Sequence, residues 1–271
     1  MPAIDGCRPF ILVPRQSALR VLPQKGMQEL YNSLTHIQTL HSTLTRGHAK
    51  TIFGDEQQRV QYNTLGVRPN RAGTGIIDLD PWAETIGRTH WRNVMRMVRR
   101  AELLFESFSP DEVIQHIQSA KDVVPFRTIC APNITDRDFD VSTRVIPRAK
   151  YFGGIAFGCN VFLRCHTDND FTLSVAHILL DGMDSYSLDD DVVVYFCFPT
   201  LGVAVPMRPG DFLLFNATIP HCISTRRLKE HKIMCTSLYL KTLVVGGNNN
   251  SIPTTDTQDL LCAKYRNMVG L

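Results

Sequence analysis

Short apolar runs, each broken by Gly, Pro or Asp, follow one another along residues 143–245, and this pattern restricts the fold more than any other in the chain. The runs are YFGGIAFGCNVFLRC, FTLSVAHILL, DVVVYFCFP, GVAVPM, GDFLLFNAT, HCISTR and KIMCTSLYLKTLVV. Turn signals separate them at LDGMDSYSLDDD and MRPGD. Several short strands at this spacing predict a β-sandwich or β-barrel, so we expect residues 143–245 to form a β core.

Residues 1–142 precede this core and mix helical patterns with loops. Apolar residues at helical spacing predict a helix in KGMQELYNSLTHIQTLHSTL and a second in PWAETIGRTHWRNVMRMVRRAELLFESF. Ser109 then precedes PDEVIQHIQSAK, with Pro110 at the first helical position, which is typical of a helix start. Between the first two helices, GVRPNRAGTGIIDLDP is rich in Gly, Pro and Arg and predicts a loop.

Composition places the chain among ordinary globular proteins. It has 271 residues, 44% hydrophobic and 20% charged, which suits one large domain or one domain with a helical extension. The net charge of +3 is too small to argue for nucleic-acid binding by itself. Residues 246–271 form a polar tail in which DLLCAKYRNMV could form a short helix.

Targeting patterns and cysteine usage indicate the compartment. The N-terminus lacks a basic region followed by a long apolar one, and no apolar run approaches about 18 residues, so we expect neither a secretory signal nor a membrane partner. None of the 8 Cys forms a C-x-x-C pair, and most lie in apolar runs. They are typical of reduced, buried cysteines in an intracellular protein.

A His-x-Asp pair in LRCHTDNDFT indicates the chemistry. His166 and Asp168 are two residues apart, so on a strand they would project to the same face. Non-haem Fe(II) oxygenases hold iron with two His and one carboxylate and leave other positions open for O₂ and a co-substrate. His221, after the turn and apolar strand of RPGDFLLFNATIPH, is the candidate for the second His. These three residues predict a metal triad.

The alternative for His166 and Asp168 alone is a polar turn between strands, but the distal His in an all-β context favours the metal site. His177 alternates with apolar residues, so we expect it to pack near the site. Cys165 and Cys222 adjoin proposed ligands; a neighbour on a strand points to the opposite face, so we expect both in the core.

The segments RCHTDND and PMRPGDFLLFNATIPHCIS resemble the Fe(II)/2-oxoglutarate-dependent dioxygenase superfamily, and the likeness covers about residues 145–245. YFGGIAFGCNVFLRCHTD and YFCFPTLGVAVPMRPGDFLLFN are most similar to its TET/JBP-type branch, which oxidises methylated pyrimidines in nucleic acid. That branch includes algal relatives that modify 5-methylcytosine. The resemblance implies an α+β fold, with a double-stranded β-helix (jelly-roll) core and N-terminal helices packed on it.

The same resemblance implies Fe(II) at His166, Asp168 and His221, and oxidation of a C–H bond at the iron. The resemblance also implies 2-oxoglutarate as the co-substrate, DNA as the partner, and 5-methylcytosine or thymine as the target base. An enzyme that acts on DNA would be intracellular and nuclear. No sequence feature predicts a protein partner.

The residue that would hold the co-substrate departs from the branch, which usually has an Arg opening the strand after the distal His. Here Lys232 takes roughly that place, with Arg226 and Arg227 earlier in STRRLKEHK. A Lys pairs with a carboxylate as a point charge and lacks the bidentate fork of Arg. Three interpretations stay open: Lys232 binds 2-oxoglutarate, Arg226 or Arg227 does, or the co-substrate is ascorbate, as in the algal relatives.

A basic stripe on the predicted second helix could contact a phosphate backbone. Arg88, Arg92, Arg96 and Arg100 recur every four residues, so they share one helical face, with Arg99 beside them. The alternative is an exposed helix whose acidic partners lie elsewhere in the fold.

Recognition of a flipped base would require stacking on an aromatic ring and hydrogen bonds to a base edge. Phe171, Tyr151 and Phe152 are candidates for the ring, and Asn169 and Asp170 for the base edge. The alternative for Asn169 and Asp170 is a plain β-turn. Two further functions stay open: the same iron chemistry on a protein or small molecule, and a β-helix binding module without catalysis.

Overall fold

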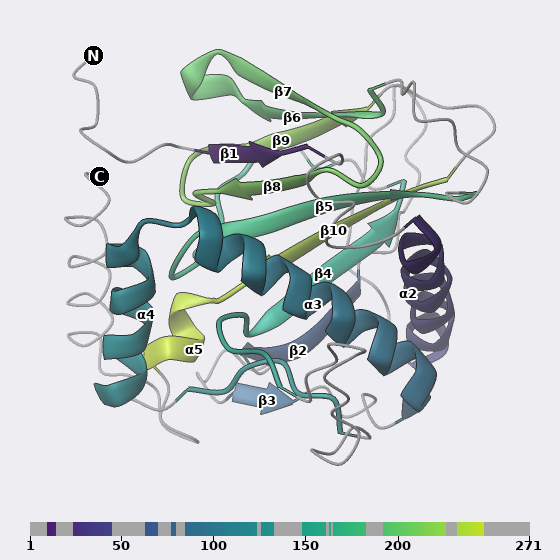
Figure 1. Ribbon diagram of the computed structural model, residues 1–271, viewed down its shortest axis with the longest axis horizontal. Helices are drawn as coiled ribbons and strands as arrows, with labels where there is room; N and C mark the ends of the chain where they lie inside the picture. Colours follow the sequence, from purple (N-terminus) through teal and green to yellow (C-terminus); the bar gives the residue numbers. More distant parts are fainter. Residues whose placement is uncertain are drawn as a thin grey trace.

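The computed structural model describes residues 10–14, 24–44, 63–69, 77–79, 85–123, 126–132, 148–160, 163, 165–182, 192–225 and 232–246. Its helices, drawn in Figure 1, have the bounds α2 Gln24–Leu44, α3 Arg88–Phe108, α4 Asp111–Val123 and α5 Thr242–Gly246. Its strands are β1 Phe10–Val13, β2 Asn63–Pro69, β3 Ile77–Leu79, β4 Gly154–Cys159, β5 Ser174–Leu180, β6 Val194–Phe198, β7 Val203–Met207, β8 Phe212–Phe215, β9 Cys222–Thr225 and β10 Ile233–Tyr239. The expected α+β class is confirmed.

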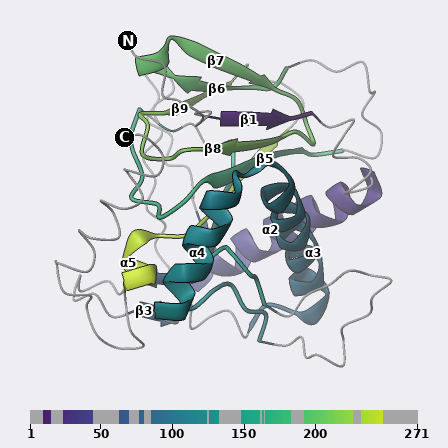
Figure 2. The same ribbon diagram turned by 60° about the vertical axis from the view of Figure 1, so that its left-hand side comes forward.

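Two antiparallel sheets form the core. The larger has seven strands in the order β1-β8-β5-β10-β4-β2-β3, and the smaller has three in the order β7-β6-β9. Figure 2 shows the smaller sheet at the top of the molecule, above β1 and β8. In the larger sheet, strands that are distant in sequence lie side by side from β1 through β8, β5 and β10 to β4, as in the jelly-roll arrangement of a double-stranded β-helix.

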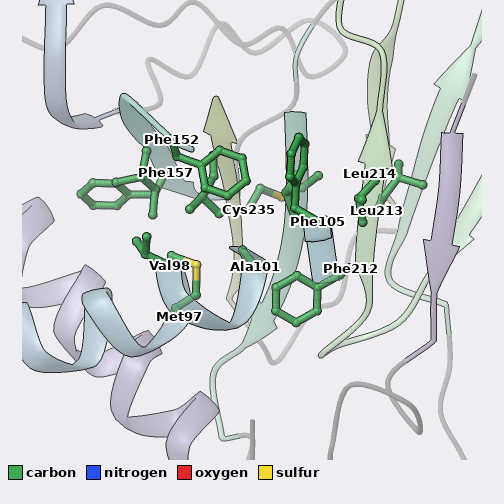
Figure 3. Close-up of a cluster of buried hydrophobic side chains, with 14 of the residues drawn as sticks. Met97, Val98, Ala101, Phe105, Phe152, Phe157, Phe212, Leu213, Leu214 and Cys235 are labelled. Carbon is green, nitrogen blue, oxygen red and sulfur yellow. The ribbon is translucent and has the colours of Figure 1, made fainter. Parts of the chain in front are cut away.

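The two faces of the larger sheet have different neighbours. Phe212 of β8 faces α3 and belongs to the cluster with Phe105 and Val98 in Figure 3. Phe215, three residues further on, projects from the other face and contacts Phe196 of the smaller sheet at 4.6 Å between ring centroids. One face is therefore covered by helices, and the other lines the interior between the sheets.

Helix α2 packs on the helix-covered face beside α3. Its Tyr31 hydroxyl lies 3.9 Å from the Cys159 thiol of β4. His36 of α2 stacks on His90 of α3, with ring centroids 4.1 Å apart. The predicted packing of N-terminal helices on the β core is thus seen for α2 and α3.

The predicted loop at residues 66–81 is partly wrong. Within it, β2 and β3 pair antiparallel, with Val67 opposite Leu79. β2 also pairs with β4, so a backbone ladder supplies the order that its Gly and Pro residues do not favour. The larger sheet therefore includes strands from residues 1–142, where we expected helices and loops.

At the other end, KTLVV does not continue the preceding strand, because α5 begins at Thr242. Residues 247–271, which include the predicted tail helix, lie outside the described part of the chain. Among the residues that the structure describes, no helix combines the length and apolar character needed to cross a bilayer.

Candidate metal centre

The triad predicted from the sequence is assembled by backbone pairing between two segments that are distant in the chain. His166 and His221 form an isolated antiparallel bridge, with N–H···O distances of 3.0 and 2.9 Å in the two directions. The Asp168 amide donates to the Ala217 carbonyl at 2.8 Å. His166 and Asp168 do not end a regular strand as expected; the bridge and this amide bond hold them instead.

The three ligand groups converge on one point. One oxygen of Asp168, Oδ2, lies 3.6 Å from His166 Nε2 and 3.8 Å from His221 Nε2. One ligand atom from each residue lies within 4.8 Å of the others. Two imidazoles and a single carboxylate are the donor set of a facial Fe(II) site with open positions, so these residues fit that metal.

His221 is fixed in the orientation that metal binding requires. Its Nδ1 lies 2.9 Å from the Ile219 carbonyl and donates to it in the matching tautomer, which leaves the Nε2 lone pair facing the triad. Phe196 stacks on the imidazole and Phe215 meets it edge-on, with centroids 5.5 and 5.1 Å away. Burial lowers the pKa of His221, which favours the neutral ring that a metal needs.

The site is open on one side. The His221 side chain is 4% exposed, whereas those of His166 and Asp168 are 33% and 38% exposed. Small molecules can therefore reach the centre from solvent past His166 and Asp168.

Lys241, which the sequence analysis did not single out, completes the charge balance of the centre. Its Nζ lies 3.0 Å from Asp168 Oδ1 and 2.6 Å from Asp170 Oδ1. Asp170 and Lys241 form an isolated bridge, supported by a bond from the Thr242 amide to the Asn169 carbonyl at 3.0 Å. With Oδ1 of Asp168 held by Lys241, Oδ2 is left to face the two imidazoles.

Lys241 is positioned by the end of β10. Its Nζ lies 4.8 Å from the centre of the Tyr239 ring. That ring lies against Gly154 of β4, where an added Cβ would come within 2.7 Å of it. Gly154 is therefore required for the Tyr239 ring to lie where it does beneath the ammonium group.

The charges around Asp168 favour its ionised form. Burial would raise the pKa of this carboxyl, but the His166 ring and the Lys241 ammonium outweigh it and hold the pKa well below its usual range. The group is thus the anion that a divalent cation requires.

Two residues that the sequence predicts as substrate contacts, Asp170 and Phe171, are buried. Asp170 is 5% exposed, and its carboxylate is occupied by Lys241 and by the Ser174 hydroxyl at 2.6 Å. Phe171 is 1% exposed and stacks on His116 of α4. Tyr151 and Phe152 are buried too. Asn169 is exposed next to the triad, and its role in binding stays a prediction.

Lys232 does not lie at the metal centre. It precedes the first residue of β10, whereas Lys241 follows the last, so about 20 Å of strand separates the two positions. Lys232 lines a separate pocket with Tyr31 of α2, Asn160 and Asp181. From that pocket, the Lys232 ammonium group cannot reach a co-substrate bound at the triad. Arg226 and Arg227 lie outside the described residues.

The structure does not bring the arginine stripe to the triad. Arg92, Arg96 and Arg100 lie on α3, which covers the face of the larger sheet opposite to the one that His221 contacts through Phe215. Arg96 pairs with Glu29 of α2 at 3.5 Å, and Arg99 lies 3.9 Å from Glu102. Part of the arginine stripe thus has acidic partners, as expected if α3 is an exposed helix that does not contact DNA.

Fold and site together define a double-stranded β-helix protein with a His-Asp-His centre between its sheets. Comparison of the sequence with family models found no match, and comparison with curated proteins found no relative.

Among solved structures, the chain is similar to NgTET1 in complex with 5mC DNA, with a TM-score of 0.55, 10% identity, and coverage of 96% of this chain and 82% of that one. It also matches a Pseudomonas putida prolyl-4-hydroxylase, with a TM-score of 0.43, 11% identity, and coverage of 86% and 92%. A third match is the non-heme alpha ketoglutarate dependent carbocyclase SnoK from nogalamycin biosynthesis, at 0.41, 11%, and coverage of 88% and 82%. At this level of identity, the first likeness establishes the shared fold.

Proposed function

We propose that this chain is a non-haem Fe(II) dioxygenase of the 2-oxoglutarate-dependent type. The observation that carries the proposal is the convergence of His166, Asp168 and His221 on one point, with the ligand atoms within 4.8 Å of one another. Bound there, iron would supply activation of O₂ next to a C–H bond. The alternative of a β-helix binding module without catalysis would not require two imidazoles and a carboxylate arranged to bind a metal with open positions.

The chain's own residues would prepare the centre in three ways. The Ile219 carbonyl orients His221, and Lys241 holds one oxygen of Asp168 so that the other can bind metal. Phe196 and Phe215 exclude water from the buried side of His221. The exposed side, past His166, is left for the co-substrate and the substrate.

For the substrate, we propose a methylated pyrimidine in DNA, with 5-methylcytosine before thymine. Support comes from the fold shared with NgTET1, a protein solved in complex with 5mC DNA. Such an enzyme would work where DNA is found, in keeping with the intracellular and nuclear location expected from the sequence.

The test is incubation of the protein in air with Fe(II), the co-substrate (2-oxoglutarate, or ascorbate in a parallel reaction) and duplexes that carry 5-methylcytosine or unmodified cytosine, followed by mass spectrometry of the released nucleosides. The expected result is oxidised 5-methylcytosine with the wild-type chain and none with His166→Ala. Consumption of the co-substrate without any change to the DNA would reject the DNA substrate and retain the iron chemistry.

The co-substrate is 2-oxoglutarate in this proposal, and ascorbate is the alternative. Ascorbate is favoured by the position of Lys232, which lies away from the triad. Anaerobic addition of Fe(II) and 2-oxoglutarate should give a metal-to-ligand charge-transfer band when the keto acid chelates the iron. Iron binding without that band, together with turnover on ascorbate, would select the alternative.

A second candidate is the same chemistry on a protein or small molecule. It is favoured by the ion pair of Arg96 with Glu29, which neutralises part of the proposed DNA-binding stripe, and by the burial of Phe171. Turnover of a peptide or small molecule in the absence of any DNA oxidation would support it.

A further inference from the structure

A polar pocket lies between α2 and the ends of three strands of the larger sheet, on the side of the molecule where α2 packs (Figure 1). It has a volume of about 710 Å³, which is within the range of small-molecule sites. Every residue that lines it carries a hydrogen-bonding group, and the lining comes from α2, the ends of β4 and β5 and the start of β10. The metal centre lies at the other end of β10, so the pocket is a separate site.

A cation and an anion lie side by side in this pocket. Ile233 pairs with Leu180, and the next pair along the two strands is closed by a hydrogen bond from the Asp181 amide to the Lys232 carbonyl at 2.9 Å. Residues directly opposite each other in a ladder project to the same side of the sheet, with their Cβ atoms about 5 Å apart. Both side chains line the pocket, so the two charges face the same space.

The Cys159 thiol, which also lines the pocket, reports both charges. Burial raises the pKa of this thiol, and the two charges act on it in opposite directions: Lys232 lowers its pKa and Asp181 raises it. Within the described part of the chain, neither Lys232 nor Asp181 has an ion-pair partner, and they are not paired with each other. The pocket therefore offers one ammonium and one carboxylate to a ligand.

The wall of the pocket formed by α2 and β4 carries neutral hydrogen-bonding groups. Tyr31 is 4% exposed, and its hydroxyl lies 3.9 Å from Cys159 Sγ, a weak partner that leaves hydrogen-bonding capacity for a ligand. Burial raises the pKa of Tyr31, so the hydroxyl stays protonated and can donate. Asn160 Oδ1 accepts the Ile233 amide at 3.0 Å, which leaves Asn160 Nδ2 to donate into the pocket.

We propose that this pocket binds a free α-amino acid with a hydrogen-bonding side chain. The ligand's carboxylate would pair with Lys232 and its ammonium with Asp181, because the two charges of an α-amino acid are close together, as are the two residues. Its side chain would extend toward the Tyr31 hydroxyl and the Asn160 amide. A dicarboxylate such as 2-oxoglutarate fits less well, since one of its carboxylates would lie near Asp181.

This inference goes beyond the proposed iron chemistry and does not depend on it. The pocket and the triad share no residue. Lys232 and Asp181 are both exposed, so each charge pair with the ligand is expected to contribute modestly, about fivefold in affinity.

The test is titration of the isotope-labelled full chain with L-glutamine, followed by nuclear magnetic resonance through the amide signals of Asn160 and Asp181. Two analogues separate the charges: γ-aminobutyramide lacks the carboxylate of glutamine, and glutaramic acid lacks the ammonium group. The expected result is a saturable shift of both amide signals, with tighter binding of L-glutamine than of either analogue.

Variants assign each contact. Lys232→Met should weaken L-glutamine binding about fivefold and leave γ-aminobutyramide binding unchanged. Asp181→Asn should weaken L-glutamine binding to a similar extent and leave glutaramic acid binding unchanged. Tyr31→Phe should weaken binding of L-glutamine but not of L-norvaline, whose side chain is apolar. The control Lys25→Met, which removes an exposed cation of α2 outside the pocket, should change nothing.

Two results would overturn the proposal: no shift of the Asn160 and Asp181 amide signals up to the solubility limit of L-glutamine, or equal affinities for L-glutamine and the two analogues. An amino acid can also chelate a metal, and His166→Ala separates this event from binding in the pocket. The variant should bind L-glutamine like wild type. Loss of L-glutamine binding in His166→Ala would assign the binding to the metal centre and reject the pocket.

Discussion

Lys241 places one ammonium group between two carboxylates at the edge of the metal centre. Asp170 is nearly fully buried, so without this cation it would be an unpaired charge in a poorly solvated position. Asp168 is the more exposed of the two and also has the imidazoles beside it. Lys241 is therefore expected to matter more for Asp170, and hence for stability, than for Asp168.

Replacement of this cation should destabilise the chain. We expect Lys241→Met to lower the free energy of unfolding by about 3 kcal/mol, because it breaks a buried ion pair from one side. Urea denaturation measures the change. Asp170→Asn added to Lys241→Met should recover most of the loss, since a neutral amide requires no cation. A double variant as unstable as the single one would show that Asp170 is not the dependent group.

His177 is expected to make the fold acid-sensitive. It is fully buried against Phe212, with ring centroids 3.9 Å apart, and burial lowers its pKa to about 3. The unfolded chain takes up a proton below about pH 6.5 and the native chain does not, so stability should fall as the pH drops from 6.5 toward 3. The loss should approach 1.4 kcal/mol per pH unit, by ~2.3RT for one proton.

Urea denaturation of wild type and His177→Leu across this range measures the contribution of the imidazole. The variant should lose less stability on acidification than wild type. Parallel pH profiles for the two proteins would refute the assignment.

For individual residues, the sequence identifies the metal ligands more readily than the residues that hold those ligands in position. His166, Asp168 and His221 follow from residue type and spacing, because few side chains bind iron and they recur in a fixed order. Lys241 lies in YLKT, at the end of an apolar strand, where a basic residue is unremarkable. Only the bridge of Asp170 with Lys241 reveals its partners, and that is a tertiary contact.

Helix α3 is anchored to the β core through a buried acid. Glu102 is 0% exposed, and its Oε1 accepts the backbone amides of Lys150 and Tyr151. Burial raises the pKa of Glu102 to about 7, despite these two hydrogen bonds. One turn later, Glu106 accepts from Lys150 and from the Tyr151 hydroxyl.

The two acids of α3 should contribute to pH dependence with opposite signs. A native pKa of about 7 for Glu102 against 4.5 unfolded means that stability declines as the pH rises through this window, by about 3 kcal/mol in total. Burial would raise the pKa of Glu106, but Lys150 and Tyr151 outweigh it and lower the pKa, so its contribution is lost as the pH falls below its ordinary range.

Thermal unfolding between pH 4 and 8 separates the two acids of α3. Glu102→Gln should remove the decline with rising pH, and Glu106→Gln, the matched control on the same helix, should retain it. A Glu102→Gln profile that declines like wild type would rule out Glu102 as the titrating group.

Element type follows from sequence where local pattern and tertiary pairing agree. The β runs of the core and the helices α2, α3 and α4 were all expected close to where they lie. The hairpin of β2 and β3 was missed, because its Gly and Pro residues predict a loop and only pairing with β4 orders it. For KTLVV, in contrast, the sequence predicted a continuation of the preceding strand, because its β-branched residues are typical of strands. The structure instead begins α5 at Thr242.

At the scale of the whole molecule, the metal centre and the arginine stripe lie on different surfaces. The triad faces the interior between the two sheets, whereas α3 packs on the outer face of the larger sheet. DNA held along α3 would therefore have to extend around the sheet to place a base at the triad. This separation argues against α3 as the surface that presents a base to the triad.

The role of the stripe can be tested without breaking the helix packing. The charge swap Glu29→Arg with Arg96→Glu keeps the ion pair between α2 and α3 but removes a positive charge from the stripe. If α3 contacts DNA, Arg92→Glu and the swap should each weaken duplex binding and reduce the salt slope by about 1 per lost phosphate contact. Binding equal to wild type in both variants would exclude α3 as the DNA surface.

The central claim is that His166, Asp168 and His221 form an iron site, and anaerobic calorimetric titration with Fe(II) tests it most directly. The account predicts one Fe(II) bound per chain in wild type and in the control His90→Ala, which removes an imidazole from the α2–α3 contact. It predicts no bound Fe(II) in His166→Ala or His221→Ala. Absence of binding in wild type, or undiminished binding in His221→Ala, would contradict the claim.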